Sequence, residues 1–506
     1  MKAYLLHQGS DFNFRRDLPE GSDELSQDLG LDILCAQMGQ GDRLVTQVCK
    51  RALVVGLEDV ATIGFRQRVL SDCLQHKAVV EELYAMAAEA VDAERQIWGL
   101  YDRSSPRAVL SRAVRVLEML VGYLRRLRDL CEGHADEFSS DGFARFFKMV
   151  SEELDDAYFA EVQGHLDRLR FRGGLLVSAA LGPGNTAKGF VLHLRPGRGW
   201  RQRLASLRRS GDTFEISTRD EAGLKILDGW EVRSLNLVAN AVAQSAEHVR
   251  SFFAVLMTEL AFYVGCINLR DRLTELGEAV CMPEPLPSGE LGWSAEGLYD
   301  LVLALRSGTK AVGNEMSANA KSLIVVTGAN TGGKSTFLRS LGLAQLMMQA
   351  GMFVAASGFR AAVSSGVFTH FKREEDPALK GGKLDEELRR MSRLVKRISP
   401  GALLLCNESF ASTNEQEGSE IALELVRALS EAGVRVAYVT HLFELANTLW
   451  SEDRARSLFL RAPRQAGAQP FKLVEGAPEP TAYGEDLYRR IFEEDGELLA
   501  KGTRQG

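Results

Sequence analysis

Apolar residues recur at helical spacing along residues 31–165, and basic and acidic residues occupy the positions between them. The repeat is clearest at Val109, Ala113, Val116, Leu117, Leu120 and Leu124. Few Gly or Pro residues interrupt it, and the same spacing resumes over residues 235–272. We expect a long helical array whose two halves pack together. The most apolar stretch, residues 252–269, contains Glu259 at its centre and is typical of a buried amphipathic helix, not of a membrane span.

Between residues 165 and 229 the pattern changes to short apolar runs that are separated by Gly and Pro. The runs occupy residues 174–178, 189–194 and 213–217, with turn signals at residues 182–185 and 196–197. This pattern predicts a small strand-containing insertion within the helical array.

After residue 288, strand-like and helix-like segments alternate, which predicts a doubly wound α/β domain with a parallel sheet. The Pro-rich stretch at residues 283–288 is typical of a linker. The predicted organisation has four parts: an N-terminal segment over residues 1–30, a mainly helical region over 31–282 with the insertion at 165–229, a linker over 283–309, and an α/β domain with a C-terminal helical tail over 310–506.

Composition narrows the class of protein. The chain has 506 residues, 45% of them hydrophobic and 25% charged, so it is globular and long enough for two to four domains. Its seven cysteines are scattered and form no C-x-x-C pair, which argues against a disulfide framework and a zinc ribbon. The polar N-terminus has no signal-peptide pattern. We therefore expect a cytoplasmic protein without membrane association.

The charge is unevenly distributed. The formal net charge is -7, yet residues 165–209 contain ten Arg and Lys residues against Asp167 alone, a local charge of +9 that leaves -16 for the rest. Such a patch suits a phosphate backbone, because affinity grows with the number of counterions released. A solvated basic face or a contact for an acidic partner explains the patch equally well. The candidate DNA contacts are Arg195, Arg198, Arg201 and Arg203.

The strongest chemical signal is a phosphate-binding loop. Residues 323–327 form a strand-like run, residues 328–335 match G-x-x-x-x-G-K-S, and a helical pattern follows. In such a loop backbone N–H groups surround phosphate oxygens at a helix N-terminus, Lys334 bridges the β and γ phosphates, and Ser335 ligates Mg²⁺. The expected cofactors are ATP and Mg²⁺. The predicted nucleotide-binding residues are Gly328, Asn330, Thr331, Gly332, Gly333, Lys334, Ser335 and Thr336.

Two further buried-strand runs end in polar residues. Residues 402–406 precede Asn407 and Glu408, and residues 434–440 precede His441. Glu408 is the candidate general base. Asn407 stands where Asp is usual and would hold Mg²⁺ with Ser335, but more weakly because an amide is neutral. A histidine at a strand end is more often structural. Because the phosphate-binding loop and Glu408 are expected at the same sheet edge, His441 is a second candidate catalytic residue that could sense the γ-phosphate or position water.

Together these motifs resemble the MutS-type DNA mismatch-repair ATPases over roughly residues 310–490. Residues 328–336 are similar to that family's G-P-N-M-G-G-K-S-T, and residues 351–356 to its G-x-x-V-P-A. Residues 407–418 align without a gap to D-E-x-G-R-G-T-x-x-x-D/E-G, and residues 440–445 resemble T-H-x-x-E-L. Residues 482–484 are similar to S-Y-G. The helical array with its basic insertion resembles the family's core, lever and clamp.

The resemblance implies an ATP hydrolase that forms a homodimer, closes on DNA and exchanges conformational signals between paired ATP sites. It assigns nucleotide binding to Asn330, Gly333, Lys334 and Ser335, activation of water to Glu408, and a switch role to His441. Some positions depart from the pattern. Residues 409–412 replace a glycine and arginine turn, and residues 381–383 read Gly-Gly-Lys where a serine loop is expected. The array begins near residue 31, so we expect a relative without the N-terminal mismatch-binding domain.

Three classes of function follow. The leading hypothesis is a DNA-binding ATPase, a clamp or sensor on duplex, mismatched or branched DNA in repair or recombination, with a downstream repair protein as a further partner. The alternative is an ATP-driven conformational switch that acts on a protein partner without DNA. A nucleotide kinase or transporter-type ATPase is disfavoured, because L-S-G-G-Q is absent and a kinase does not require the helical array.

Overall fold

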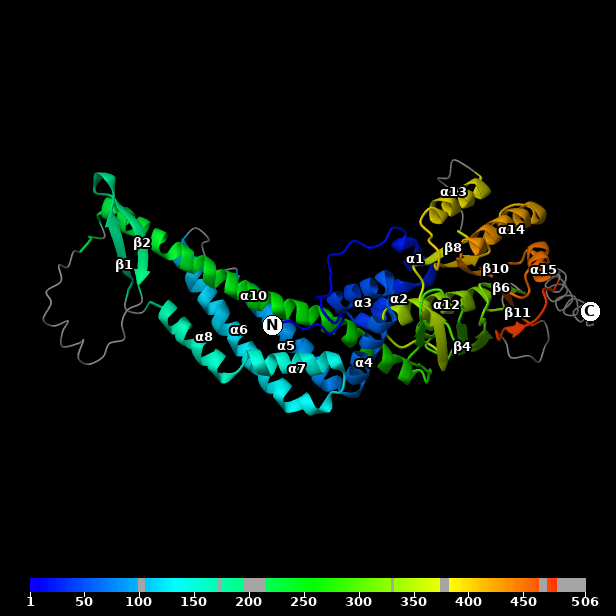
Figure 1. The fold of residues 1–506 in the computed structure, drawn as a ribbon, viewed down its shortest axis with the longest axis horizontal. Helices are drawn as coiled ribbons and strands as arrows, with labels where there is room; N and C mark the ends of the chain where they lie inside the picture. Colours follow the sequence, from blue (N-terminus) through cyan, green and yellow to red (C-terminus); the bar gives the residue numbers. More distant parts are fainter. Residues whose placement is uncertain are drawn as a thin grey trace, which may run out of the picture. The chain divides into compact units, whose positions relative to one another are not determined.

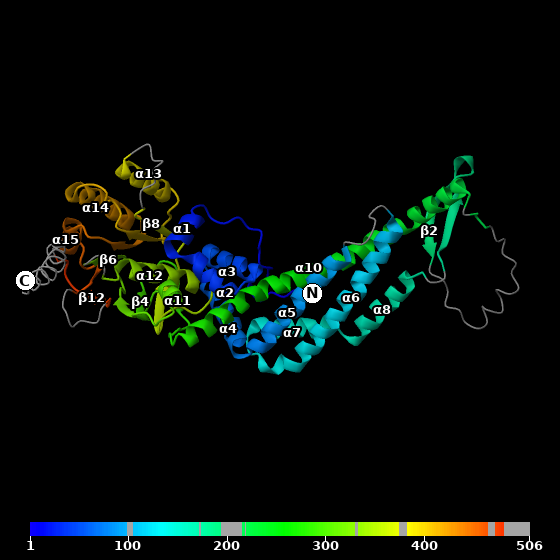
Figure 2. The ribbon, with the colours of Figure 1, turned by 180° about the vertical axis from the view of Figure 1, so that it is seen from behind.

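The computed structural model describes residues 1–98, 105–171, 174–193, 215–217, 219–328, 332–373, 382–463 and 471–479. The chain forms two compact units (Figures 1 and 2). Unit 1 comprises Met1–Leu5, Gly9–Phe12 and His76–Leu260, and unit 2 comprises Leu6–Gln8, Asn13–Gln75 and Ala261–Gly506.

Unit 1 is mainly helical. Its elements are α5 (Lys77–Trp98), α6 (Pro106–His134), the short η1 (Ala135–Glu137), α7 (Asp141–Glu153), α8 (Asp156–Leu169) and most of α10 (Glu221–Glu275). The predicted repeat is confirmed on α6, where Val116, Leu120 and Leu124 are buried. Tyr123 of α6 meets Phe253 of α10 edge to face, with ring centroids 6.3 Å apart. The two halves of the array therefore pack together, as predicted.

Glu259 is the buried charge at the centre of α10. It is fully buried, and its carboxylate accepts hydrogen bonds from the backbone N–H of Leu5 at 2.7 Å and of Phe12 at 3.0 Å. Among the described residues α10 is long and apolar enough to cross a membrane, but 67% of that apolar window is buried inside the structure. The prediction of a buried helix over residues 252–269 is confirmed.

The insertion contains an antiparallel pair of strands, β1 (Leu176–Leu181) and β2 (Ala187–His193). They are joined by η2 (Pro183–Asn185), where Gly184 adopts a φ of 67° that favours glycine. Two of the three predicted strand runs are thus confirmed. In the third run, residues 215–217 are not a strand, and residues 213–214 lie outside the described residues. The predicted end at residue 229 is wrong, because Asp220 accepts a hydrogen bond from Gly223 N and α10 already begins at Glu221.

A six-stranded sheet forms the core of unit 2, in the order β12-β11-β6-β10-β9-β8. The strands are β6 (Leu323–Thr327), β8 (Val367–Phe371), β9 (Leu403–Asn407), β10 (Arg435–Val439), β11 (Ser457–Arg461) and β12 (Val474–Glu475). All neighbouring pairs are parallel except β11 with β12. The predicted division into a helical N-terminal part and an α/β C-terminal part is confirmed.

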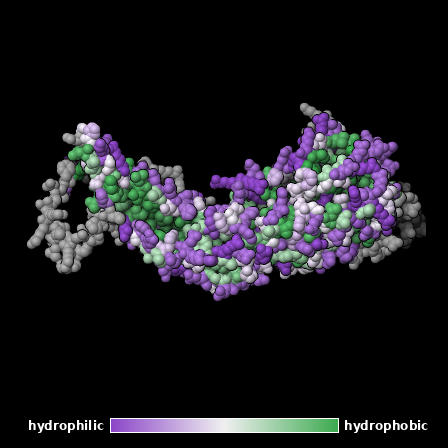
Figure 3. Space-filling model, in the orientation of Figure 1, coloured by the Kyte–Doolittle hydropathy of each residue, from purple (hydrophilic) through white to green (hydrophobic). Residues whose placement is uncertain are grey.

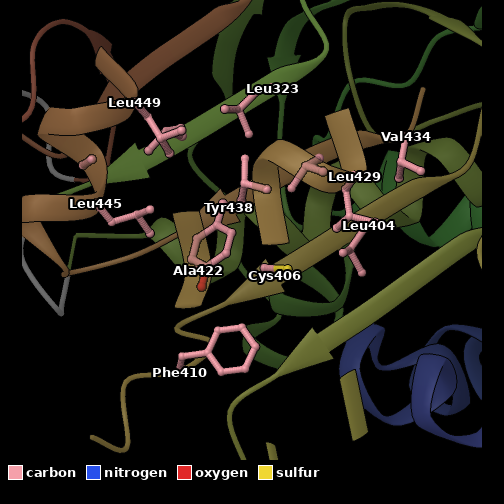
Figure 4. Close-up of a cluster of buried hydrophobic side chains, with 14 of the residues drawn as sticks. Leu323, Leu404, Cys406, Phe410, Ala422, Leu429, Val434, Tyr438, Leu445 and Leu449 are labelled. Atoms are coloured by element: carbon pink, nitrogen blue, oxygen red, sulfur yellow. The ribbon is translucent and has the colours of Figure 1, made fainter. Parts of the chain in front are cut away.

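Helices cover both faces of this sheet, because buried parallel strands must be apolar on both sides. On one face lies α12 (Lys334–Gln349), where a Cβ added to Gly342 would come within 2.6 Å of Leu405 Cδ1. The other face packs against α13 (Lys383–Val395), α14 (Glu415–Glu431) and α15 (Phe443–Glu452). Figure 4 shows this second core, with Leu404 and Cys406 of β9 among the residues of α14 and α15.

A second sheet of four strands has the order β3-β7-β4-β5. Its elements are β3 (Glu284–Leu286), β4 (Trp293–Leu298), β5 (Asn314–Ser317) and β7 (Gly358–Ala362), with α11 (Leu301–Ser307) between β4 and β5. The predicted linker at residues 283–309 is therefore wrong. Pro285 is compatible with a strand here because β3 lies at the edge of the sheet, where one row of N–H groups needs no partner.

The first four helices belong to unit 2. They are α1 (Ser22–Leu29), α2 (Leu31–Gly39), α3 (Arg43–Val55) and α4 (Val60–Gln75). Leu57 N donates to the Gln349 carbonyl at 2.8 Å, and the Gln349 amide donates back to the Leu57 carbonyl at 3.1 Å. The Arg66 guanidinium donates to the Ala350 carbonyl at 3.1 Å. The predicted boundaries at residues 30 and 310 thus do not separate compact units, since helical periodicity does not reveal which partner a helix packs against.

Replacing Glu259 tests how much unit 1 depends on this buried carboxylate. We expect Glu259→Leu to lower the free energy of unfolding by about 2–5 kcal/mol, because two buried N–H groups lose their acceptor. Glu259→Gln keeps one acceptor oxygen and costs less. Urea denaturation followed by circular dichroism measures both, with Glu247→Leu, at an exposed position of the same helix, as control. Equal stability of the Glu259→Leu and Glu247→Leu variants would contradict the account.

Candidate nucleotide-binding site

The predicted loop connects the central strand β6 to the start of α12. Gly328 has a φ of 117°, and a Cβ there would lie 2.8 Å from the backbone nitrogen of Ala462. Gly333 caps α12 with a φ of 83°. Both positions therefore require glycine. Of the other predicted nucleotide-binding residues, Gly332 and Thr336 are at the described helix entrance, and Asn330 and Thr331 lie outside the described residues.

Lys334 is the first residue of α12 and is only 3% exposed. Its ammonium group donates to the Gly328 carbonyl at 2.5 Å, so the side chain lies back across the loop. Burial lowers the pKa of Lys334, and the nearby carboxylate of Glu408 opposes that shift. A partly desolvated cation at a helix N-terminus is suited to bind phosphate.

Ser335 and Asn407 come together from separate elements. The Ser335 hydroxyl donates to Asn407 Oδ1 at 2.9 Å, which joins the start of α12 to the end of β9. Both oxygens are hard, uncharged donors of the kind that Mg²⁺ accepts beside phosphate oxygens, so the residues present fit a magnesium ion. The pair lacks the negative charge that an aspartate would supply at position 407.

Glu408 follows β9 directly, and its backbone N–H donates to the Val439 carbonyl of β10 at 2.9 Å. Its carboxylate oxygen Oε1 lies 3.9 Å from His441 Nδ1. The pKa of Glu408 is lowered, first by the His441 imidazole and then by the cations of Lys334 and Lys372, against the effect of burial. Glu408 is therefore ionised at neutral pH and can accept a proton.

The same edge of the sheet holds His441, because Thr440 N donates to the Val326 carbonyl of β6 at 3.0 Å. The structure thus brings together Lys334, Ser335, Asn407, Glu408 and His441, as the sequence predicted. Parallel strands place their carboxyl ends at one edge, which is why residues more than 100 positions apart meet here.

The sequence analysis did not predict two residues that lie near the site, Lys372 and Phe471. Lys372 directly follows β8, and its N–H donates to the Asn407 carbonyl at 3.0 Å. The strand-like run at residues 367–371 was the available signal for it. Phe471 is 55% exposed, and its Cβ lies 3.4 Å from where a Cβ on Gly333 would be. No motif marks Phe471, since only the fold brings it beside the loop.

The predicted DNA contacts Arg195, Arg198, Arg201 and Arg203 all lie outside the described residues. Elsewhere in the basic region Arg170 pairs with Glu118 at 2.7 Å, so its charge is compensated. Lys188 on β2 is exposed. Of the two, only Lys188 presents its charge to solvent without an acidic partner in the described structure.

A Gly-rich loop between a buried parallel strand and a helix that begins Lys-Ser-Thr defines a P-loop ATPase domain. Residues 324–484 match the family model for MutS domain V, and residues 58–276 match the model for the MutS2 N-terminal domain. The chain belongs to the MutS family.

Individual relatives agree with this assignment. An endonuclease MutS2 of Lacticaseibacillus casei is 32% identical over 253 residues, 47% of this chain and 31% of the relative. A DNA mismatch repair protein MutS of Thermus aquaticus is 31% identical over 182 residues, 35% of this chain and 22% of the relative. An endonuclease MutS2 of Thermus thermophilus is 29% identical over 182 residues, 36% of this chain and 24% of the relative. The matched part thus spans less than a third of these relatives.

Restoring an acid at position 407 tests the magnesium site. We expect Asn407→Asp to reach half-maximal ATP hydrolysis at roughly 3–10-fold lower Mg²⁺, and to turn over faster, because a carboxylate attracts the cation more strongly. A magnesium titration of the ATPase rate measures the shift. Asn319→Asp, the same charge change at an exposed position, serves as control. An unchanged titration for Asn407→Asp would count against this account of the site.

Proposed function

We propose that this chain binds and hydrolyses ATP with Mg²⁺ and couples hydrolysis to DNA binding. The observation that carries the proposal is the meeting of a phosphate-binding lysine, a hydroxyl and amide pair, and an ionised carboxylate beside a histidine at one sheet edge. These are the groups that phosphoryl transfer to water requires.

Each residue has a role in the proposed reaction. The amides of the loop and Lys334 bind the β and γ phosphates. Ser335 and Asn407 would hold Mg²⁺, which would supply neutralisation of phosphate charge. Glu408 accepts the proton of the attacking water, which its lowered pKa permits. His441, whose Nδ1 lies 3.9 Å from the Glu408 carboxylate, is the switch residue that senses the γ-phosphate or positions the attacking water. The exposed ring of Phe471 offers a stacking face for the base.

The DNA part of the proposal is supported by the relatives and by charge. One relative is named for DNA mismatch repair and the others as endonucleases. The local +9 within an acidic chain suits a phosphate backbone, which is read without base contacts. We therefore propose a homodimeric clamp or sensor on duplex, mismatched or branched DNA that acts in repair or recombination, with a downstream repair protein as a further partner.

A second candidate is a conformational switch that acts on a protein partner. Its support is apolar surface on unit 1, visible as green areas in Figure 3. Leu181 of β1 and Ile226, Trp230 and Leu237 of α10 are exposed. A cavity of about 940 Å³ lies between α6, α10 and the two strands. Apolar surface of this kind serves a protein interface better than a phosphate backbone.

The ATPase rate separates these functions. We expect wild-type protein to hydrolyse ATP and Glu408→Gln to lose at least about 100-fold in kcat while still binding nucleotide, because the amide cannot accept the proton. Rates are compared with no DNA, homoduplex, a single mismatch and a four-way junction. If the four-way junction stimulates hydrolysis, and matched and mismatched duplexes give equal rates, the protein recognises DNA shape and not mismatches. No stimulation by any DNA favours the protein-partner switch.

Salt and charge reversal test the basic insertion. We expect DNA affinity to fall by orders of magnitude between about 50 and 200 mM salt, because phosphate contacts release counterions. Arg198→Glu, Arg201→Glu and Arg203→Glu combined should weaken binding to duplex and junction alike. Reversal of the exposed Arg15, Arg43 and Arg393 is the matched control. If the insertion variant binds DNA as tightly as wild type in fluorescence anisotropy, the insertion has no role in binding.

A further inference from the structure

The turn after the candidate general base has an unusual backbone. Glu408 has a φ of 53° and Phe410 a φ of 62°, and neither residue is glycine. Side chains with a Cβ rarely adopt this left-handed conformation, so a turn that contains two of them persists only where its surroundings hold it. The orientation of the Glu408 carboxylate depends on this backbone.

Glu387 of α13 holds the turn from one side. It is 7% exposed, and its two carboxylate oxygens accept hydrogen bonds from the backbone N–H of Phe410 at 2.9 Å and the hydroxyl of Ser412 at 2.8 Å. A buried carboxylate that accepts from a backbone N–H forms one of the stronger hydrogen bonds in proteins. Glu387 therefore fixes the positions of Phe410 and Ser412.

His370 of β8 holds the same turn from another side. Its Nδ1 lies 2.7 Å from the Ser409 hydroxyl, and its Nε2 lies 3.3 Å from the Glu387 carbonyl. Burial lowers the pKa of His370 to about 3, so the ring is neutral and has one hydrogen. The Ser409 hydroxyl also binds the His370 backbone, because it donates to the His370 carbonyl at 2.9 Å.

Two further contacts complete the support. The His370 ring stacks on Phe410 with centroids 5.7 Å apart, and the Tyr438 hydroxyl donates to the Ser409 carbonyl at 2.8 Å. Figure 4 shows the Tyr438 hydroxyl on the side of the core where Phe410 lies. Side chains from β8, β10 and α13 therefore converge on residues 409–412.

We propose that Glu387, supported by His370, is a positioning residue for hydrolysis: it holds the turn that aims Glu408, so the placement of α13 controls the rate of the chemical step. This inference rests on the proposed ATPase function. Glu387 lies outside the nucleotide-binding loop and acts through the backbone N–H of Phe410 and the hydroxyl of Ser412. Its loss therefore affects kcat and leaves nucleotide binding intact.

The test is steady-state kinetics with nucleotide affinity measured in parallel. We expect Glu387→Ala to lower kcat by about 10–100-fold and to change KM and the Kd for ADP by less than about threefold, because binding groups stay in place while the base is misdirected. Glu387→Gln retains an oxygen for Phe410 N–H and should keep most of the activity. Glu386→Ala, its neighbour on α13, is the matched control because it makes no described hydrogen bond to residues 409–412.

Amide hydrogen exchange over residues 408–412 provides a readout that does not need activity. We expect faster exchange in Glu387→Ala than in wild type and no change in Glu386→Ala. A wild-type kcat or unchanged exchange in Glu387→Ala overturns the proposal, as does an equal loss of nucleotide binding and hydrolysis.

If Glu387→Ala does not fold, Ser412→Ala takes its place, with an expected loss of about 3–10-fold in kcat; a wild-type rate overturns the proposal. If wild-type protein hydrolyses no more ATP than Glu408→Gln, the proposed function fails, and the exchange measurement alone decides whether Glu387 holds the turn.

Discussion

The burial of α12 is the constraint on which unit 2 depends. Thirteen of its sixteen residues are buried, including every residue from Ser340 to Gln349. A helix with buried side chains on every face needs packing partners on every face. The parallel sheet covers one face, and the N-terminal helices cover another through the paired backbone and amide contacts of Leu57 with Gln349. The helix that follows the phosphate-binding loop is thereby packed on several sides, and this packing places Lys334 and Ser335 beside the strand ends.

The site is an edge of that sheet where polar groups replace an apolar core. Asn407, Glu408 and His441 lie at the carboxyl ends of the neighbouring parallel strands β9 and β10. The N-terminus of α12, which follows β6, lies at the same edge of the sheet. The electrostatics are mixed: Lys334 is partly desolvated, the pKa of Glu408 is lowered first by His441 and then by neighbouring cations, and Asn407 adds no charge. Strained backbone beside such a site is typical of functional positions, where surrounding contacts compensate the strain. Here those contacts come from β8, β10 and α13, outside the loop itself.

Unit 1 is organised around the long helix α10. Its long helix α10 requires continuous apolar surface, and the one charge at its centre, Glu259, is satisfied by the backbone of the N-terminal residues. Near β1 the same helix exposes apolar side chains, while the positive charge of the chain is concentrated in residues 165–209. A MutS-family ATPase domain is thus joined to a helical region that exposes apolar side chains and carries a basic stretch of sequence, the two features that the proposed partners would use.

The sequence by itself determined the local features: the phosphate-binding loop, the strand ends at Asn407, Glu408 and His441, and the helices of the array, because glycine spacing and hydrophobic periodicity are local signals. The tertiary structure alone decided which elements are neighbours. It placed residues 13–75 in the ATPase unit, turned a Pro-rich stretch into edge strand β3, and brought Glu387 to the turn beside Glu408. Periodicity shows which face of an element is buried but not which partner covers it, and a hydrogen bond between residues 23 positions apart leaves no pattern in the sequence.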